Sequence, residues 1–208
     1  WDMEFELVKL DKLSNDETSI YSLFIEDENK TLFDMFIEEN VINHKAEVED
    51  IIKRLHNIGK VGARIHFFKV DEGVPGDGVC ALYDNPNSYL RLYCIRYGTQ
   101  IVILGNGGYK PKSVKKFQEV DKLKDENYFL RKISKEITQR LSDKDILITN
   151  DFKDFEGDLI QRLIGTRLKA VQVKIEQKKR EVENILSELK KLHNLKELKK
   201  ETEVQIQN

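Results

Sequence analysis

The sequence is poor in the residues that build metal sites and disulfide frameworks. It has two cysteines, Cys80 and Cys94, both among apolar neighbours, and four histidines, none at a metal-ligand spacing from another. Zinc sites need cysteine or histidine at short, regular spacings, and disulfide-stapled domains need several cysteines. We therefore expect two buried thiols in a cytoplasmic protein, with no metal ion and no other cofactor.

Long apolar runs and nucleotide-binding loops are also missing. No run of about 18 apolar residues occurs, so we expect no transmembrane helix and no membrane partner. The start, WDMEFELVKL, is acidic and alternating and does not predict a signal peptide. The glycine-rich stretch 105–108 lacks the Gly-Lys-Ser/Thr ending of a phosphate loop. No Ser-His-Asp or Cys-His set has a spacing that supports nucleophilic catalysis.

Charge is abundant but unevenly distributed. Residues 1–90 carry 9 Lys or Arg against 19 Asp or Glu, a balance of -10. Residues 91–140 carry 12 against 5, a balance of +7. A locally basic region attracts polyanions even when the whole chain is nearly neutral, as here with a net charge of -2. The alternative is that these are the solvated faces of basic helices.

The first 60 residues predict two strands followed by two helices. Residues 3–10 and 18–25 alternate between apolar and polar positions, as in an antiparallel strand pair. Thr31 is a good N-cap for a first helix. A second helix is expected to begin after Asn43 and to end near Gly59, which suits a C-cap.

Residues 90–112, LRLYCIRYGTQIVILGNGGYKPK, form the centre of the predicted fold. The pattern predicts two strands joined by a hairpin turn at residues 97–100. The second strand, residues 101–104, is apolar enough to be buried on both faces. We expect it to end at residues 105–108, because consecutive glycines weaken a strand interior. The hairpin therefore brings arginines, tyrosines and lysines to one end of a sheet.

The rest of the chain predicts a basic helix up to about Leu141, two short strand-like segments and a helical tail. Apolar residues in the tail repeat every seven positions, at Leu168, Ile175, Val182 and Leu189, which indicates a coiled-coil seam. Lys178 interrupts the matching second position, so a bent helix remains an alternative. The tail is expected to form homo-oligomers through residues 166–195.

These patterns predict an α+β fold in two parts. Residues 1–159 form a domain with an antiparallel or mixed sheet and helices packed on one face. Residues 160–208 form a long, coiled-coil-like helical extension.

Basic and aromatic side chains of the central region suggest an RNA site. Phosphates can be held by Arg91, Arg96, Lys110 and Lys112, and bases can stack on Tyr93, Tyr97 and Tyr109. Lys115 and Lys116 extend the basic segment and are expected to be exposed. RNA cleavage by a 2′-hydroxyl needs a base, an acid and positive charge, which lysine, arginine and tyrosine can supply without a metal. The alternative is that Arg91 and Tyr93 are packing and edge residues.

The same hairpin, preceded by helices and by RIHFFKVDEG, resembles the RelE/HigB-like toxins of bacterial type II toxin–antitoxin systems, including their phage-derived branch. The resemblance covers roughly residues 18–142. It implies a small metal-independent endoribonuclease that cleaves mRNA on the ribosome and is neutralised by an antitoxin protein. Arg91 matches the family's strand arginine, and Lys110 and Lys112 match the lysines that follow the apolar strand.

Two functional hypotheses follow. The first is a toxin-like endoribonuclease with Arg91, Lys110, Lys112 and Tyr93 as catalytic residues, and Arg96, Tyr109, Lys115 and Lys116 as RNA-binding residues. The second is a non-catalytic module that binds RNA or a protein and oligomerises through its C-terminal helix.

Overall fold

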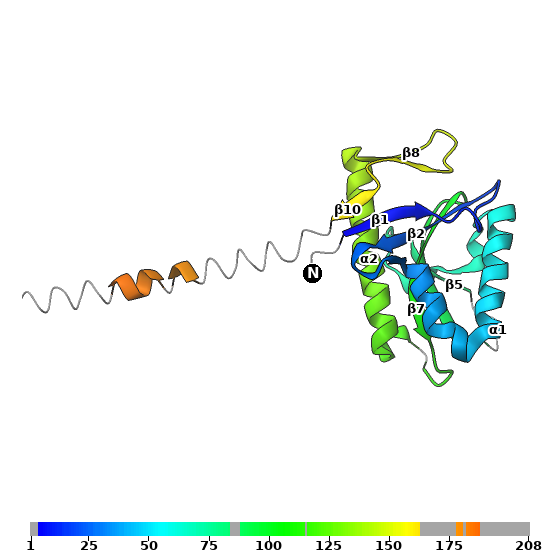
Figure 1. The fold of residues 1–208 in the computed structure, drawn as a ribbon, viewed down its shortest axis with the longest axis horizontal. Helices are drawn as coiled ribbons and strands as arrows, with labels where there is room; N and C mark the ends of the chain where they lie inside the picture. The colour runs from blue at the N-terminus through cyan, green and yellow to red at the C-terminus, as the bar shows by residue number, and fades with distance from the viewer. Residues whose placement is uncertain (1–3, 84–87, 115, 163–177, 181, 188–208) are drawn as a thin grey trace, which may run out of the picture. The chain divides into compact units, whose positions relative to one another are not determined.

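The computed structural model describes residues 4–83, 88–114, 116–162, 178–180 and 182–187 (Figure 1). Met3–Arg162 forms one compact unit, and the following residues belong to a second unit. No helix in the described part of the chain is long and apolar enough to cross a membrane.

The elements of the first unit follow one another in this order: β1 (Glu4–Lys9), β2 (Ser19–Ile25), η1 (Glu26–Glu28), β3 (Lys30–Thr31), α1 (Leu32–Val61), η2 (Ile65–Phe67), β4 (Phe68–Lys69), η3 (Val70–Glu72), β5 (Val79–Leu82), β6 (Leu90–Tyr97), β7 (Ile101–Tyr109), η4 (Phe117–Glu119), α2 (Asp121–Asp143), β8 (Ile146–Ile148), β9 (Phe155–Gly157) and β10 (Ile160–Arg162).

One mixed sheet organises this unit. Its strand order is β10-β1-β2-β7-β6-β5-β4, with β3 paired to β2. β2 and β7 pair in parallel, while β1 with β2 and β6 with β7 are antiparallel. The predictions of an antiparallel β1–β2 pair, of a β6–β7 hairpin and of an α+β fold with a mixed sheet are confirmed.

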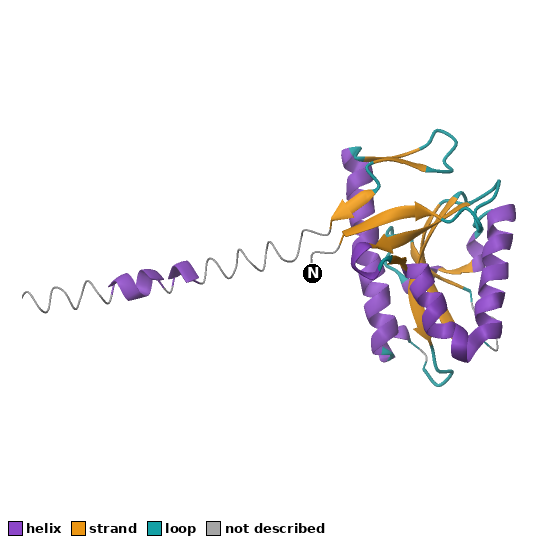
Figure 2. Ribbon diagram, viewed as in Figure 1, coloured by secondary structure: helices purple, strands orange, loops and turns teal. Residues whose placement is uncertain are grey.

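The two long helices cover opposite faces of the sheet (Figures 1 and 2). Val102 and Leu104 of β7 share a core cluster with Ile51 of α1, whereas a side chain at Gly105 would meet Leu130 of α2. Neighbouring residues of a strand point to opposite faces, so α1 and α2 lie on different sides. The prediction that helices pack on one face is therefore wrong. The apolar run at 101–104 is buried on both faces because each face has its own helix.

Strand β7 continues through the glycine-rich stretch that was expected to end it. Leu92 pairs with Gly107 and Cys94 with Leu104, so two residues of β7 lie opposite one residue of β6 in a β-bulge. A Cβ on Gly107 would lie 1.9 Å from the carbonyl oxygen of Arg91. The glycines permit close approach of the neighbouring strand and of α2, so this segment is a strand that needs glycine.

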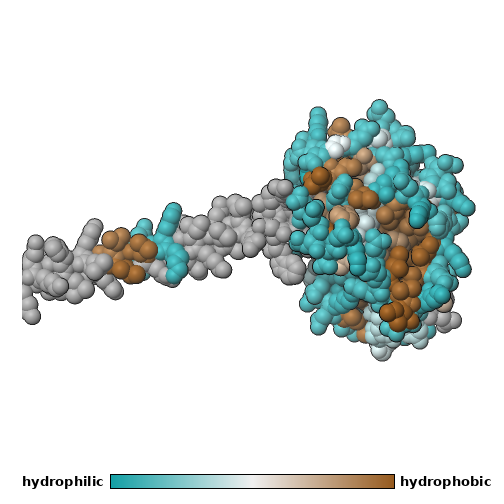
Figure 3. Space-filling model, viewed as in Figure 1, coloured by the Kyte–Doolittle hydropathy of each residue, from teal (hydrophilic) through white to brown (hydrophobic). Residues whose placement is uncertain are grey.

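Helix α1 begins as predicted and bends where the break was expected. The Thr31 hydroxyl accepts a hydrogen bond from the Asp34 N–H, and the Asp34 side chain accepts one from the Thr31 N–H, which makes a capping box. His44 is non-helical, with φ -135° and ψ 38°. The helix ends at Gly62 rather than at the predicted Gly59, which is buried. Hydrophobic surface gathers over α1 (Figure 3).

The end of the domain differs from the predicted boundary. β8 and β9 form a hairpin, and Ile160–Arg162 form β10, which pairs with β1. The predicted helical extension from residue 160 is thus wrong for its first three residues. Residues 178–180 and 182–187 are helical. Leu168, Ile175 and Leu189 of the predicted seam lie outside the described residues, and self-association through 166–195 stays a prediction.

Cys80 and Cys94 are buried free thiols, as expected. They face each other across β5 and β6, with 3.5 Å between the two sulfur atoms. Burial raises the pKa of the Cys94 thiol well above its ordinary value, and the hydrogen bond with Cys80 acts in the same direction.

Candidate nucleic-acid interface

Three stacked rings form an aromatic cluster at the end of the β6–β7 hairpin: His44, Tyr89 and Tyr109. The ring centroids of Tyr89 and Tyr109 are 5.5 Å apart with 15° between the planes. Those of His44 and Tyr109 are 5.3 Å apart with 23° between the planes. Tyr109 is 45% exposed, so the cluster reaches solvent and offers π-surface to a flat ligand.

Three separate elements bring these rings together. Tyr109 is the last residue of β7 and pairs with Leu90, the first residue of β6, and Tyr89 directly precedes Leu90 in the chain. His44 lies at the bend of α1, and its non-helical backbone marks the change of direction. Because α1 covers the face toward which Tyr109 points, the bend places the imidazole against the tyrosine.

The Glu47 side chain holds Tyr89 and His44 of the aromatic cluster in place. One of its carboxylate oxygens accepts hydrogen bonds from the Tyr89 N–H (2.7 Å), the Leu90 N–H (3.0 Å) and the Ser88 hydroxyl (2.9 Å). Its other oxygen lies 3.5 Å from Nδ1 of His44. Burial raises the pKa of Glu47, but the hydrogen bonds outweigh it and leave the pKa below its ordinary value. The ionised carboxylate thus holds the start of β6 and orients the imidazole.

Lysines lie next to the rings. The Lys112 ammonium is 4.9 Å from the Tyr89 ring centroid, a cation–π contact, and the residue is exposed. The Lys110 ammonium donates to the Val114 carbonyl at 2.9 Å, which holds the loop after β7. Lys116 is exposed as predicted, and Lys115 lies outside the described residues. The structure therefore brings Tyr109, Lys110 and Lys112 together.

Arg91 and Tyr93 are not part of this surface. Both lie on the α2 face, since Arg91 pairs with Gly108 whereas Tyr109 pairs with Leu90. The Arg91 side chain is 2% exposed and forms an ion pair with Glu72. Tyr93 is 0% exposed. The structure does not bring either side chain to this surface, because α2 covers both and Glu72 balances the arginine charge. Their contacts with phosphate and base stay a prediction.

Arg96 lies at the opposite end of β6 from Leu90. Its guanidinium donates to the carbonyls of Ala63 (3.1 Å) and Gly98 (2.8 Å) and lies 5.9 Å from the Phe68 ring centroid. Six residues of extended strand separate it from the aromatic cluster by about 20 Å. Its predicted place beside the lysines is therefore wrong, and its contacts hold the turn between β6 and β7.

The side chains of Asn106 and Glu126 form a polar pair between β7 and α2. Asn106, 2% exposed, donates from Nδ2 to a carboxyl oxygen of Glu126 at 3.1 Å. Burial raises the pKa of Glu126 from 4.5 to about 7; Lys122 lowers it, and Glu39 and Asp125 raise it. Lys122 also forms an ion pair with Glu39 and so links α2 to α1. The carboxyl therefore keeps its proton to a higher pH than an exposed glutamate does.

His44, Glu47 and Tyr89 are site residues that the sequence alone did not single out. The expected helix break after Asn43 placed His44 at an element boundary, but its partner lies 65 positions further on, at Tyr109. Only the tertiary fold brings them together. Among the described residues, no group of three or more histidine, cysteine or carboxylate side chains could hold a metal ion.

No protein-family model matches the chain, and neither curated proteins nor solved structures give a significant match.

Proposed function

We propose that this protein binds single-stranded RNA at the aromatic cluster. The observation that carries the proposal is the exposed stack of His44, Tyr89 and Tyr109 beside Lys112. Single-stranded nucleic acids bind where aromatic rings stack on bases and cations follow the backbone. RNA rather than DNA is favoured by the resemblance to mRNA-cleaving toxins, which also makes the ribosome a proposed partner.

Each side chain has a defined role in this proposal. Tyr109 stacks on a base, because it is the most exposed of the three rings. Lys112 contacts the neighbouring phosphate from its place over Tyr89. Glu47 acts indirectly, by holding Tyr89 and His44 in place.

Tyr109→Ala tests the base contact. Stacking on one base contributes about 1–3 kcal/mol, so the variant is expected to bind a fluorescent single-stranded RNA roughly 5- to 150-fold more weakly in anisotropy titrations. Tyr83→Ala is the matched control: Tyr83 is 54% exposed and also carries a lysine over its ring, Lys69 at 5.2 Å. Equal losses in both variants, or no RNA binding by the wild type at low salt, would contradict the proposal.

Lys112→Ala tests the phosphate contact. Because each phosphate contact with a single strand releases counterions, the slope of log K against log salt is expected to decrease in magnitude by about 0.7. Lys53→Ala on the exposed side of α1 is the control. An unchanged slope would place the lysine outside the RNA path.

Endoribonuclease activity, neutralised by an antitoxin, is a second candidate function. The favouring observation is that His44, one of the three stacked rings, pairs with Glu47, with 3.5 Å between Nδ1 and the carboxylate. A carboxylate-oriented imidazole can accept the proton of a ribose 2′-hydroxyl; the 2′-oxygen then attacks the phosphorus, and the 5′-oxygen leaves with a proton from a general acid. Lys112 can stabilise the phosphorane charge.

His44→Ala separates cleavage from binding. If His44 is the base, the rate of RNA cleavage in EDTA is expected to fall by about 10²–10⁴-fold, while affinity falls far less. His56→Ala, on the exposed side of α1, is the control. A substrate in which the nucleotide before the cleaved phosphate lacks its 2′-hydroxyl is expected not to be cut at that phosphate. Wild-type protein that binds RNA without cleaving it would contradict the nuclease function and support RNA binding only.

A further inference from the structure

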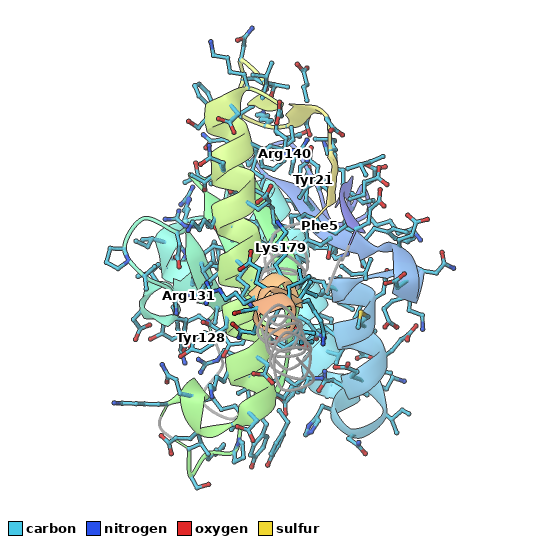
Figure 4. All side chains as sticks on the ribbon, turned by 90° about the vertical axis from the view of Figure 1, so that its left-hand side faces the viewer. Phe5, Tyr21, Tyr128, Arg131, Arg140 and Lys179 are labelled. Atoms are coloured by element: carbon cyan, nitrogen blue, oxygen red, sulfur yellow. The ribbon has the colours of Figure 1, made fainter. Side chains whose placement is uncertain are left out.

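A groove of about 900 Å³ lies between the loop that follows η3 and the outer surface of α2. Residues 74–77 form one wall, and α2 residues between 128 and 142 form the other. Tyr128 and Arg131 mark this side of α2 in Figure 4. None of the residues that line it belongs to the aromatic cluster.

The loop wall is fixed by one carboxylate. Asp77 accepts hydrogen bonds from the N–H groups of Val74 and Val79, each at 2.9 Å, and lies 3.4 Å from Nε of Arg131. The Asp77 carbonyl accepts a hydrogen bond from the Ser134 hydroxyl of α2. These contacts tie the loop to the helix, so the groove is formed without a ligand.

The lining combines positive charge with apolar surface. Arg131, Lys132 and Lys135 face a single carboxylate, Asp77, which the loop and Arg131 already use. Lys132 and Lys135 are exposed. Val74 is 46% exposed on the opposite wall. A ligand that fits both features carries negative charge on one side and aliphatic groups on the other.

The single aromatic ring of the lining argues against RNA. The Arg131 guanidinium lies 5.4 Å from the Tyr128 ring centroid, so it occupies that face of the ring. A nucleic acid would find cations in the groove but only this one ring, in contrast with the three stacked rings of the aromatic cluster.

We propose that this groove docks an acidic, amphipathic segment of a partner protein. The aspartate or glutamate side chains of the segment contact Lys132 and Lys135, and its aliphatic side chains pack against Val74 and the loop. This surface is independent of the RNA site, so a protein partner and RNA can bind at the same time.

The test uses the full chain and a fluorescent synthetic peptide with leucines at helical spacing and glutamates between them. Lys132→Glu with Lys135→Glu is expected to weaken binding by at least about tenfold. Lys53→Glu with Lys60→Glu makes the same change in net charge on exposed residues of α1 and is expected to leave affinity within about twofold. Circular dichroism verifies that both variants are folded.

Two further probes decide between the alternatives. A peptide with serine in place of leucine is expected to bind at least about tenfold more weakly, because it keeps the charge contacts but loses the aliphatic packing against Val74 and the loop. A single-stranded oligouridylate is expected not to displace the peptide. The proposal is overturned by wild-type protein that binds no glutamate–leucine peptide at low salt, by equal affinity for the serine peptide, by equal losses in the two lysine variants, or by displacement of the peptide by RNA.

Discussion

Glu126→Gln tests the half-buried carboxyl that α2 directs toward Asn106 of β7. Burial raises the pKa of Glu126 from 4.5 to about 7 in the folded chain. Between these two values the folded state holds a proton that the unfolded state has lost, so stability falls as the pH rises through this window. A pKa of about 7 in the folded chain corresponds to a loss of up to about 3 kcal/mol above pH 7. Glutamine cannot ionise, yet its Oε1 can still accept the hydrogen bond from Asn106.

The variant is therefore expected to match the wild type near pH 5 and to be more stable by about 1–3 kcal/mol near pH 8. For a chain of this size each kcal/mol raises Tm by about 2–4 °C. Urea unfolding from pH 5 to pH 8 measures the difference directly. Glu136→Gln makes the same chemical change about three turns further along α2 and is expected to keep the wild-type profile. A Glu126→Gln chain that loses stability at pH 8, or keeps the wild-type slope, would refute the reasoning.

Two further predictions concern the sheet. Gly107→Ala is expected to cost about 1–3 kcal/mol or more, because its Cβ would lie 1.9 Å from the Arg91 carbonyl. Gly76→Ala is the control in urea unfolding, since it adds the strain of its φ of +91° but meets no atom within 4 Å; the reasoning fails if Gly107→Ala is the milder change. Cys80 and Cys94 are expected to react with a thiol reagent only slowly until denaturant is added, because both are buried and burial raises the pKa of Cys94; rapid labelling of the native chain would show that β5 and β6 separate readily.

The parts of the fold that could be predicted are those whose cause is local. Alternation in β1 and β2, the cap at Thr31 and the β6–β7 turn all depend on residues within a few positions of one another. The course of β7 beyond Leu104 depends instead on close approach to α2, through Leu130. A glycine run therefore looked like a strand end when it was a place of close packing.

The candidate site was predicted where neighbours in sequence stay neighbours in space. Tyr109, Lys110 and Lys112 are such a set. Arg91 and Tyr93 were misplaced because alternation in β6 assigns residues to two faces without showing which face a helix covers, and here both faces are covered. His44 could not be found because its stacking partners come from another layer of the fold.

The pairing of β10 with β1 has a consequence for the order in which the domain is made. Glu4 pairs with Arg162, so the outer edge of β1 stays open until β10, the last described strand of this sheet in chain order, has been synthesised. Until then β1 presents unpaired backbone groups on a growing chain, which is the kind of edge that recruits other strands. The pairing also places Glu4 and Arg162, near the two chain ends of the Met3–Arg162 unit, side by side, so a circular permutant of this unit with a short linker between them is expected to fold. Completion of the sheet thus coincides with completion of the domain.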